Sequence, residues 1–170
     1  MKIMVTGSAG FIGFHFAKNL LGDGFEVLGI DNMNDYYDPQ LKEARLAELK
    51  CFDNFTFKKI DIADKEKLSS EVDSFQPEKV VHLAAQAGVR YSIENPYVYL
   101  DANLTGFLNI LELCRHNSVE GLIYASSSSV YGANTNISCS IDDQTDRPIA
   151  LYGATKKANE LMAHAYSHLY

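Results

Sequence analysis

The stretch Ile3-Met4-Val5-Thr6-Gly7-Ser8-Ala9-Gly10-Phe11-Ile12-Gly13 decides the fold of this 170-residue chain. An apolar run that leads directly into glycines three residues apart predicts a strand, a tight turn and the start of a helix. Glycine lets the backbone approach a ligand closely, and the free N–H groups and dipole of a helix N-terminus favour a diphosphate. Taken alone, such a motif is also compatible with an ordinary glycine-rich turn.

An acidic residue further along the chain favours the ligand-binding interpretation. A second predicted strand, residues 25–30, is followed by Asp31, which lies eighteen residues beyond Gly13. This spacing is close to the roughly 20 residues expected for the carboxylate that binds an adenosine ribose. Because residues 32–34 (Asn-Met-Asn) supply no cation for a 2′-phosphate, we predict that the chain binds NAD in preference to NADP.

Composition places the chain among ordinary globular domains and excludes several classes of partner. Its length fits one domain, 46% of its residues are hydrophobic, and its formal charge of −7 argues against nucleic acid. Cys51, Cys114 and Cys139 lack disulfide or metal-site spacing, which suggests a reducing compartment and no bound metal. With no apolar run of membrane length and a first strand that begins almost at Met1, we expect a cytoplasmic protein without membrane association.

Strands and helices alternate along the whole chain. Further strands are predicted at residues 55–60, 79–83 and 122–125, with helices at 41–49, 65–75, from 96 to about 116, and from 152 to the end. This pattern predicts an α/β fold, a Rossmann doubly wound parallel sheet with strand order 3-2-1-4-5 spanning residues 1–170. A sixth strand is missing from the sequence, so we expect the fifth strand to be an exposed edge.

A second group of polar residues follows the fifth predicted strand. The run Ser126-Ser127-Ser128-Ser129 precedes Val130-Tyr131-Gly132, and Tyr152 lies four residues before Lys156, a spacing that places both on one face of a helix. Neither feature is informative alone, but both lie where ligands bind in open α/β sheets. His82, within an apolar strand, is expected to be a packed core residue, and Arg90 to be solvated rather than bound to an anion.

With these motifs the chain resembles the extended short-chain dehydrogenase/reductases, specifically the nucleotide-sugar 4-epimerases. The resemblance rests on the glycine motif, Asp31-Asn32, Asp61-Ile62, His82-Leu83-Ala84-Ala85, Asn103, residues 126–132 and the Tyr152–Lys156 pair. Residues 32–37, 86–90 and 154–160 look most like those of UDP-glucuronate 4-epimerases. Uronate decarboxylases and 4,6-dehydratases share most of these motifs. The dehydratases, however, carry an Asp and a Glu beside the catalytic Thr where this chain has Ser128 and Ser129.

The resemblance implies a role for each matching position. Tyr152 would be the catalytic base, Lys156 its partner, and Ser127, rather than Ser128, the catalytic hydroxyl; Ser127, Ser128 and Tyr152 would contact the substrate. A tyrosine with its ordinary pKa near 10 is a poor base at neutral pH, and the positive charge of Lys156 favours the phenolate. The cofactor would be held by Gly7, Gly10, Phe11, Ile12, Gly13, Asp31, Asn32, Asp61, Ile62, Leu83, Ala84, Ala85, Asn103, Tyr152 and Lys156.

The implied activity is epimerisation at C4 of a UDP-sugar through a transient 4-keto intermediate. Family members continue for well over a hundred further residues, which hold the sixth strand and most of the sugar-nucleotide pocket. We therefore expect this chain to bind NAD without turnover, or to be a non-catalytic NAD-binding or interaction module. The resemblance also implies a homodimer through the helices from Pro96 and Tyr152, with Leu108, Leu111, Leu161 and Met162 as candidate apolar contacts.

Overall fold

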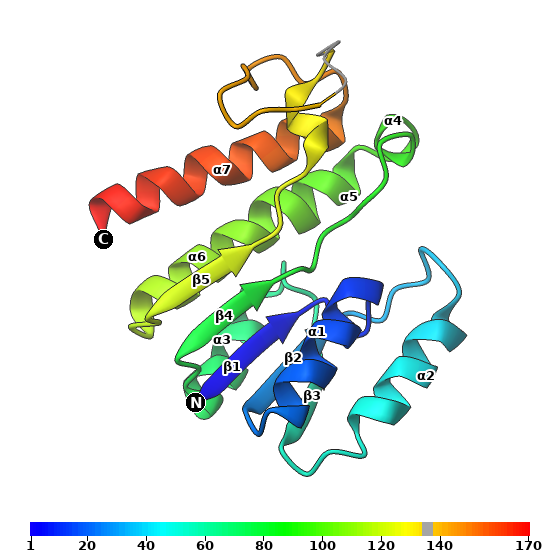
Figure 1. Cartoon of the computed structure of the whole chain (residues 1–170), viewed down its shortest axis with the longest axis vertical. Helices are drawn as coiled ribbons and strands as arrows, with labels where there is room; N and C mark the ends of the chain where they lie inside the picture. Colours follow the sequence, from blue (N-terminus) through cyan, green and yellow to red (C-terminus); the bar gives the residue numbers. More distant parts are fainter. Residues whose placement is uncertain (134–137) are drawn as a thin grey trace.

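The computed structural model describes residues 1–133 and 138–170 and contains a five-stranded parallel sheet (Figure 1). The strand order β3-β2-β1-β4-β5 confirms the order predicted from the sequence. Each strand agrees with its predicted position to within one residue at either end. The strands are β1 (Lys2–Thr6), β2 (Glu26–Asp31), β3 (Phe55–Lys59), β4 (Lys79–His82) and β5 (Gly121–Tyr124).

Helices connect the strands, and local sequence signals determine where several of them begin. Asp38 accepts a hydrogen bond from the N–H of Gln40 and is followed by Pro39, which marks the start of α2. Asp64 caps α3 in the same way through the N–H of Lys67. The helical segments are α1 (Phe11–Gly22), α2 (Pro39–Leu49), α3 (Lys65–Phe75), α4 (Tyr91–Glu94), α5 (Tyr97–Tyr99), η1 (Leu100–Thr105), α6 (Gly106–His116), η2 (Ser128–Tyr131) and α7 (Leu151–Leu169).

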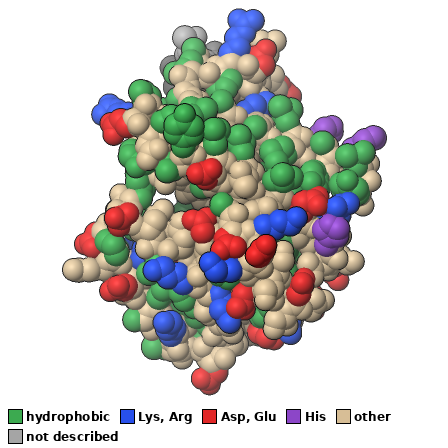
Figure 2. Space-filling model, turned by 180° about the vertical axis from the view of Figure 1, so that it is seen from behind, with side chains coloured by type: hydrophobic (Ala, Val, Ile, Leu, Met, Phe, Trp, Pro, Cys, Tyr) green, Lys and Arg blue, Asp and Glu red, His purple; other side chains and the backbone are tan. Residues whose placement is uncertain are grey.

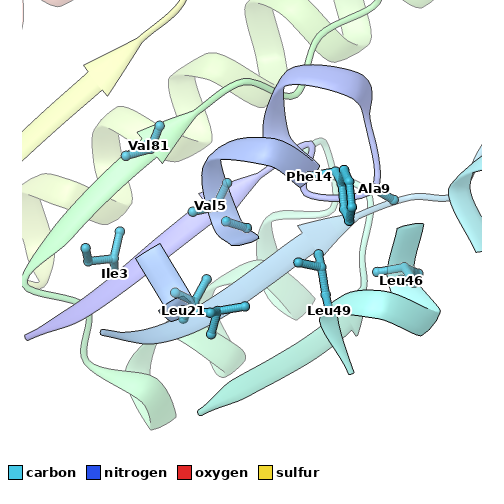
Figure 3. Close-up of a cluster of buried hydrophobic side chains, with 10 residues drawn as sticks. Ile3, Val5, Ala9, Phe14, Leu21, Leu46, Leu49 and Val81 are labelled. Atoms are coloured by element: carbon cyan, nitrogen blue, oxygen red, sulfur yellow. The ribbon is translucent and has the colours of Figure 1, made fainter. Parts of the chain in front are cut away.

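The core has two layers because successive side chains of a strand point to opposite faces of the sheet. Ile3 and Val5 of β1 pack with α1 and α2 on one face, in the cluster drawn in Figure 3. Met4 lies on the other face, where α3 and α6 provide Leu68 and Ile110. Both faces of the central strand β1 are therefore covered by apolar contacts. Each such buried side chain stabilises the fold by about 1.5–3 kcal/mol.

The helix expected from residue 96 to 116 is not uniform. Pro96 has helical dihedral angles but stands at the N-cap of α5 without a side-chain cap, since Asn95 ends α4. In addition, η1 is a π-helix between the α-helical segments α5 and α6. The short helix α4 was not predicted. Leu111 is only 4% exposed, so the expectation that it could contact a partner chain is wrong.

The two neighbouring strands β4 and β5 differ sharply in exposure. Val81 of β4 is 6% exposed, whereas Ile123, its register partner in β5, is 67% exposed. Within the described residues β5 pairs with β4 alone, so the expected exposed edge is present. None of the described helices combines the length and the apolar character that crossing a membrane requires.

Candidate active site

The glycine turn connects β1 to α1 and leaves no room for a side chain at Gly7 or Gly13. Gly7 has a positive φ of 72°, and its N–H donates to the carbonyl oxygen of Ile30 at 2.7 Å. A Cβ on Gly7 would lie 2.8 Å from the nitrogen of Ala84, and one on Gly13 only 2.0 Å from the oxygen of Gly7. Glycine is therefore required at both positions, and the turn brings the N-terminus of α1 to the carboxyl ends of β1 and β4.

Asp31, at the end of β2, has a fixed carboxylate. Its Oδ2 accepts from the N–H of Ala9 at 3.2 Å, and its Oδ1 accepts from the N–H of Met33 at 2.8 Å. The next residue, Asn32, donates from its side chain to Oδ2 of Asp61 at 2.9 Å. These bonds fix Asp31 and link its neighbour Asn32 to Asp61, so three predicted cofactor positions are held in place.

A buried cation beside Asp31 corrects the expectation that none is near. Lys42 of α2 is 4% exposed, and its Nζ lies 3.5 Å from Oδ1 of Asp31 and 2.8 Å from Oδ1 of Asn34. The expectation rested only on residues 32–34, directly after Asp31. Lys42 shares the buried face of α2 with Leu46 and Leu49. This helical spacing predicts that the lysine faces the sheet and is the signal that could have identified it.

A cleft of about 260 Å³ opens between these elements. Nine of the predicted cofactor positions line the cleft together: Gly7, Gly10, Asp31, Asn32, Asp61, Ile62, Leu83, Ala84 and Ala85. Gly13 lies beneath the turn, and Phe11 and Ile12 are exposed at the start of α1. Tyr36 and Tyr37, which the sequence offered as possible ligand covers but more readily as part of a connector, also line the cleft. Further lining residues outside the predicted site are Asn34, Lys42, Ile60, Gln86, Ala87 and Ala102.

The serine turn after β5 packs directly against the start of α7. Ser127 caps η2, where its Oγ accepts from the N–H of Ser129 at 3.2 Å. A Cβ on Gly153 would lie 2.6 Å from the oxygen of Ser129, so the backbone of α7 next to Tyr152 touches this turn. The structure thus brings the turn with Ser127 and Ser128 to the residues around Tyr152, as expected from the sequence.

Lys156 is a buried ammonium one helical turn after Tyr152. It is 3% exposed, and burial lowers its pKa to about 8 although the Glu160 carboxylate raises it. With this pKa, Lys156 is mostly protonated at neutral pH and places a positive charge on the face of α7 that carries Tyr152. Glu160 accepts from Oγ of Ser126 at 2.6 Å, which ties α7 to the serine run.

Asn103 of η1 joins three segments that are distant in the sequence. Its side chain donates to the carbonyl oxygen of Gln86 at 3.1 Å and to Oγ1 of Thr155 at 3.1 Å, and accepts from the N–H of Gln86 at 2.8 Å. Asn159 donates to its carbonyl oxygen at 2.6 Å. In the structure the side chain of Asn103 thus bonds to the segment after β4 and to α7; the cofactor contact stays a prediction.

Two further polar residues lie at the ends of β1 and β4. Oγ1 of Thr6 accepts from the N–H groups of Leu83 and Ala84 and lies 2.8 Å from Nδ1 of His82. Because the two N–H groups use both lone pairs of this oxygen, the Thr6 hydroxyl donates its proton to Nδ1 of His82. Burial, and next the charge of Lys156, lower the pKa of His82 to about 3, so the ring is neutral. His82 is buried, in line with its interpretation as a core residue, and Arg90 is exposed.

The residues of the cleft fit a dinucleotide. The turn has no space for Cβ atoms where a diphosphate would approach the start of α1, and a carboxylate is held in place where a ribose is expected. Tyr152 and Lys156 lie beyond the cleft residues, at the carboxyl edge of the same sheet. An open α/β sheet binds its ligands at this edge.

Comparison with known proteins identifies the class of this fold and site. The family model described as GDP-mannose 4,6 dehydratase matches residues 4–170. The chain therefore belongs to this family of extended short-chain dehydrogenase/reductases.

Within this family, the chain is similar to several individual proteins. The chain is 58% identical over its whole length to protein CapI of Staphylococcus aureus, of which it covers 51%. It is 49% identical to a probable UDP-glucuronate 4-epimerase of Rhizobium meliloti, covering 50% of that protein. The structure of UDP-glucuronic acid 4-epimerase from Bacillus cereus with UDP-glucuronic acid and NAD superposes with a TM-score of 0.90 at 34% identity, over 99% of this chain and 53% of the other. The chain spans about half the length of the curated relatives it matches.

Proposed function

We propose that this chain is the NAD-binding part of a UDP-sugar 4-epimerase, with UDP-glucuronate and UDP-galacturonate as its substrate and product. The observation that carries the proposal is the placement of Tyr152 and the buried ammonium of Lys156 on one face of α7, against the serine turn. Asn103 links this helix, through Thr155, to Gln86 of the cleft. Relatives at 48–49% identity named UDP-glucuronate 4-epimerase support this choice of substrate.

The residues of the site divide the work as follows. Tyr152 removes the proton from the C4 hydroxyl of the sugar and later returns a proton to the same oxygen. The charge of Lys156 favours the phenolate form of Tyr152, and the hydroxyl of Ser127 donates a hydrogen bond to the C4 oxygen. NAD, when bound, supplies the group that accepts the C4 hydride. The glycine turn and Asp31 hold the diphosphate and the adenosine ribose.

Dehydration is the alternative that the family model raises. A dehydratase needs an acid and a base beside the catalytic hydroxyl to remove water from the sugar. Ser128 and Ser129 occupy these positions here, and neither side chain is an acid or a base at neutral pH. Epimerisation needs no such pair, which favours it over dehydration.

The partner proposed on the protein side is a second copy of the chain. Leu108 of α6 is 40% exposed and Leu161 of α7 is 61% exposed, and the two helices contact each other. In Figure 2, hydrophobic side chains gather in the upper half of the view, whereas the lower half carries interspersed charges. Light scattering should give the mass of a dimer at micromolar protein; a monomer would refute this part of the proposal.

The proposal is tested by binding and by turnover on the 170-residue chain. Calorimetry should show NAD binding, since the cleft residues all lie within the chain; a folded chain that fails to bind NAD would overturn the proposal. UDP-glucuronate should remain unchanged, because poor substrate positioning alone can cost about a hundredfold and much of the relatives' length is not represented. Formation of UDP-galacturonate that disappears in Tyr152→Phe would contradict this last point. Release of carbon dioxide would indicate a decarboxylase.

A further inference from the structure

The buried lysine beside Asp31 has more hydrogen-bonding capacity than it uses. An ammonium has three N–H donors, and among the described residues Lys42 Nζ finds two acceptors, Asp31 Oδ1 at 3.5 Å and Asn34 Oδ1 at 2.8 Å. The distance to Asp31 is long for a charge-assisted hydrogen bond. The ammonium also lies 5.0 Å from the centroid of the Tyr37 ring.

Lys42 faces the cleft rather than solvent. It lines the same cavity as Asp31, Asn34 and Tyr37, and its side chain is 5% exposed. A second cation, Arg45, lies further along α2 and donates from Nη1 to the carbonyl oxygen of Ala9 and to the hydroxyl of Tyr37. At this end of the cleft Lys42 therefore contacts the carboxylate of Asp31, and Arg45 supports the lining residue Tyr37 from outside the cleft.

We propose that Lys42 is a specificity-determining residue. Asp31 excludes NADP partly because its carboxylate pairs with the Lys42 ammonium, which is then not available to bind a 2′-phosphate. The inference rests on the proposed binding of NAD. Asp31 repels a 2′-phosphate directly, and its carboxylate also neutralises the only ammonium that touches it within the described residues. Without the charge of Asp31, Lys42 provides a site for a 2′-phosphate.

A purely structural ion pair makes a different prediction. If Lys42 only anchors α2 to β2, its removal changes stability and weakens both dinucleotides alike. If Lys42 offsets the charge of Asp31 within the cleft, its removal weakens NADP more than NAD, because the carboxylate is then uncompensated. The ratio of the two dissociation constants therefore separates the two roles.

The experiment measures the dissociation constants of NAD and NADP by calorimetry at fixed ionic strength. In Asp31→Asn the ratio of the NADP constant to the NAD constant should fall about tenfold or more, because one negative charge next to the phosphate is gone. Adding Lys42→Met to Asp31→Asn should reverse most of that fall in the ratio. Lys42→Met alone should raise the ratio above that of the original chain.

Two controls make the result specific. Lys50→Met removes one positive charge at the exposed end of the same helix and should leave the ratio within about twofold. Lys42→Arg keeps the charge and should stay closer to the original ratio than Lys42→Met. The pair 2′,5′-ADP and 5′-AMP repeats the comparison without the nicotinamide half of the ligand.

The outcomes distinguish this inference from the proposed function. If the original chain does not bind NAD, the proposed function fails. The role of Lys42 is refuted, and NAD binding stands, if the original chain binds NAD but the ratio is unchanged in Asp31→Asn. The same holds if the double variant keeps the full fall in the ratio. Should Asp31→Asn fail to fold, the single variants Lys42→Met and Lys42→Arg decide, since the inference requires the ratio to rise more in the first than in the second.

Discussion

The turn around Gly7 and the serine turn around Ser127 both lie at the carboxyl edge of the sheet, but the chain surrounds them differently. Gly7 is held by contacts to β2 and to the segment after β4, and nothing larger than a hydrogen fits there. Ser126 and Ser128 are exposed, and the adjoining strand β5 is an open edge. Substitutions in the first region should therefore act mainly through steric clashes, and those in the second mainly through charge and protonation.

The largest effect is expected from Gly13→Ala. The new Cβ would lie 2.0 Å from the oxygen of Gly7, so the turn or the start of α1 must move. The free energy of unfolding should fall by about 3 kcal/mol, and NAD binding should be lost with the turn. Urea denaturation and calorimetry measure the two effects.

Gly22→Ala is the matched control for this change. Gly22 ends the same helix, and a Cβ there meets nothing within 4 Å. Since alanine restricts the unfolded chain more than glycine does, stability should rise by up to about 1 kcal/mol. Equal losses in the two variants would show that the turn around Gly13 is not specially constrained.

At the other region, Lys156→Met should raise stability in a pH-dependent way. The pKa of Lys156 is about 8 in the folded chain, below the value near 10.4 of an unfolded one, so the unfolded state binds more protons between these pH values. The burial penalty is present in full below about pH 8 and is relieved as the pH rises toward 10.4. Lys156→Met should remove this penalty, about 3 kcal/mol at pH 7 and close to zero at pH 10.4.

The measurement is urea denaturation of both chains from pH 7 to pH 10.4. Lys50→Met, an equal change of charge at an exposed site, should keep the rise of stability with pH that Lys156 produces. A stability difference between Lys156→Met and the original chain that does not change with pH would contradict the buried ammonium.

A smaller effect is expected from Glu160→Gln. Its carboxylate accepts from Ser126 at 2.6 Å and from Lys157 at 3.0 Å, and its charge raises the pKa of Lys156. The substitution should cost about 1 kcal/mol and move the pKa of Lys156 further below 8. NMR titration of the Lys156 side chain reports the second effect. Glu48→Gln, whose carboxylate pairs with Lys18 at an exposed site, should leave that pKa unchanged.

The smallest effect tests the edge strand. Ile123→Thr places a hydroxyl at a side chain that is 67% exposed and should change the free energy of unfolding by less than about 0.5 kcal/mol. Val81→Thr, at its register partner, buries an additional hydroxyl and should cost about 1–3 kcal/mol. Similar costs at both positions would show that β5 is covered in solution.

The sequence predicted the sheet well because β1 and β4 contain short apolar runs, with Gly7 directly after β1 and Ala84-Ala85 shortly after β4. It predicted the cleft positions on the strand ends for the same reason, since a strand end fixes where the next residues lie. The π-helical turn in η1 was missed because apolar periodicity does not reveal an extra residue within one turn.

Lys42, the missed cation of the cleft, lies on a connecting helix rather than at a strand end. Lys42 reaches Asp31 only because α2 packs its Leu46 face against the sheet, a tertiary arrangement that spacing from Asp31 does not give. The exposure of the Phe11 and Ile12 side chains likewise could not be predicted from the sequence. Both are apolar, and only the direction of α1 away from its turn determines which of its first residues face solvent.

The hydrogen bonds of Asn103 have a consequence for local opening of the molecule. Breaking them separates the segment at Gln86, the π-helical turn and the start of α7 at the same time, so no one of these segments can loosen independently. Such a unit exchanges its amide hydrogens cooperatively. The N–H of Gln86, bonded to a side chain and not to a strand, should therefore exchange as slowly as the amides of η1, and the loss of one amide group in Asn103→Ala should accelerate both together.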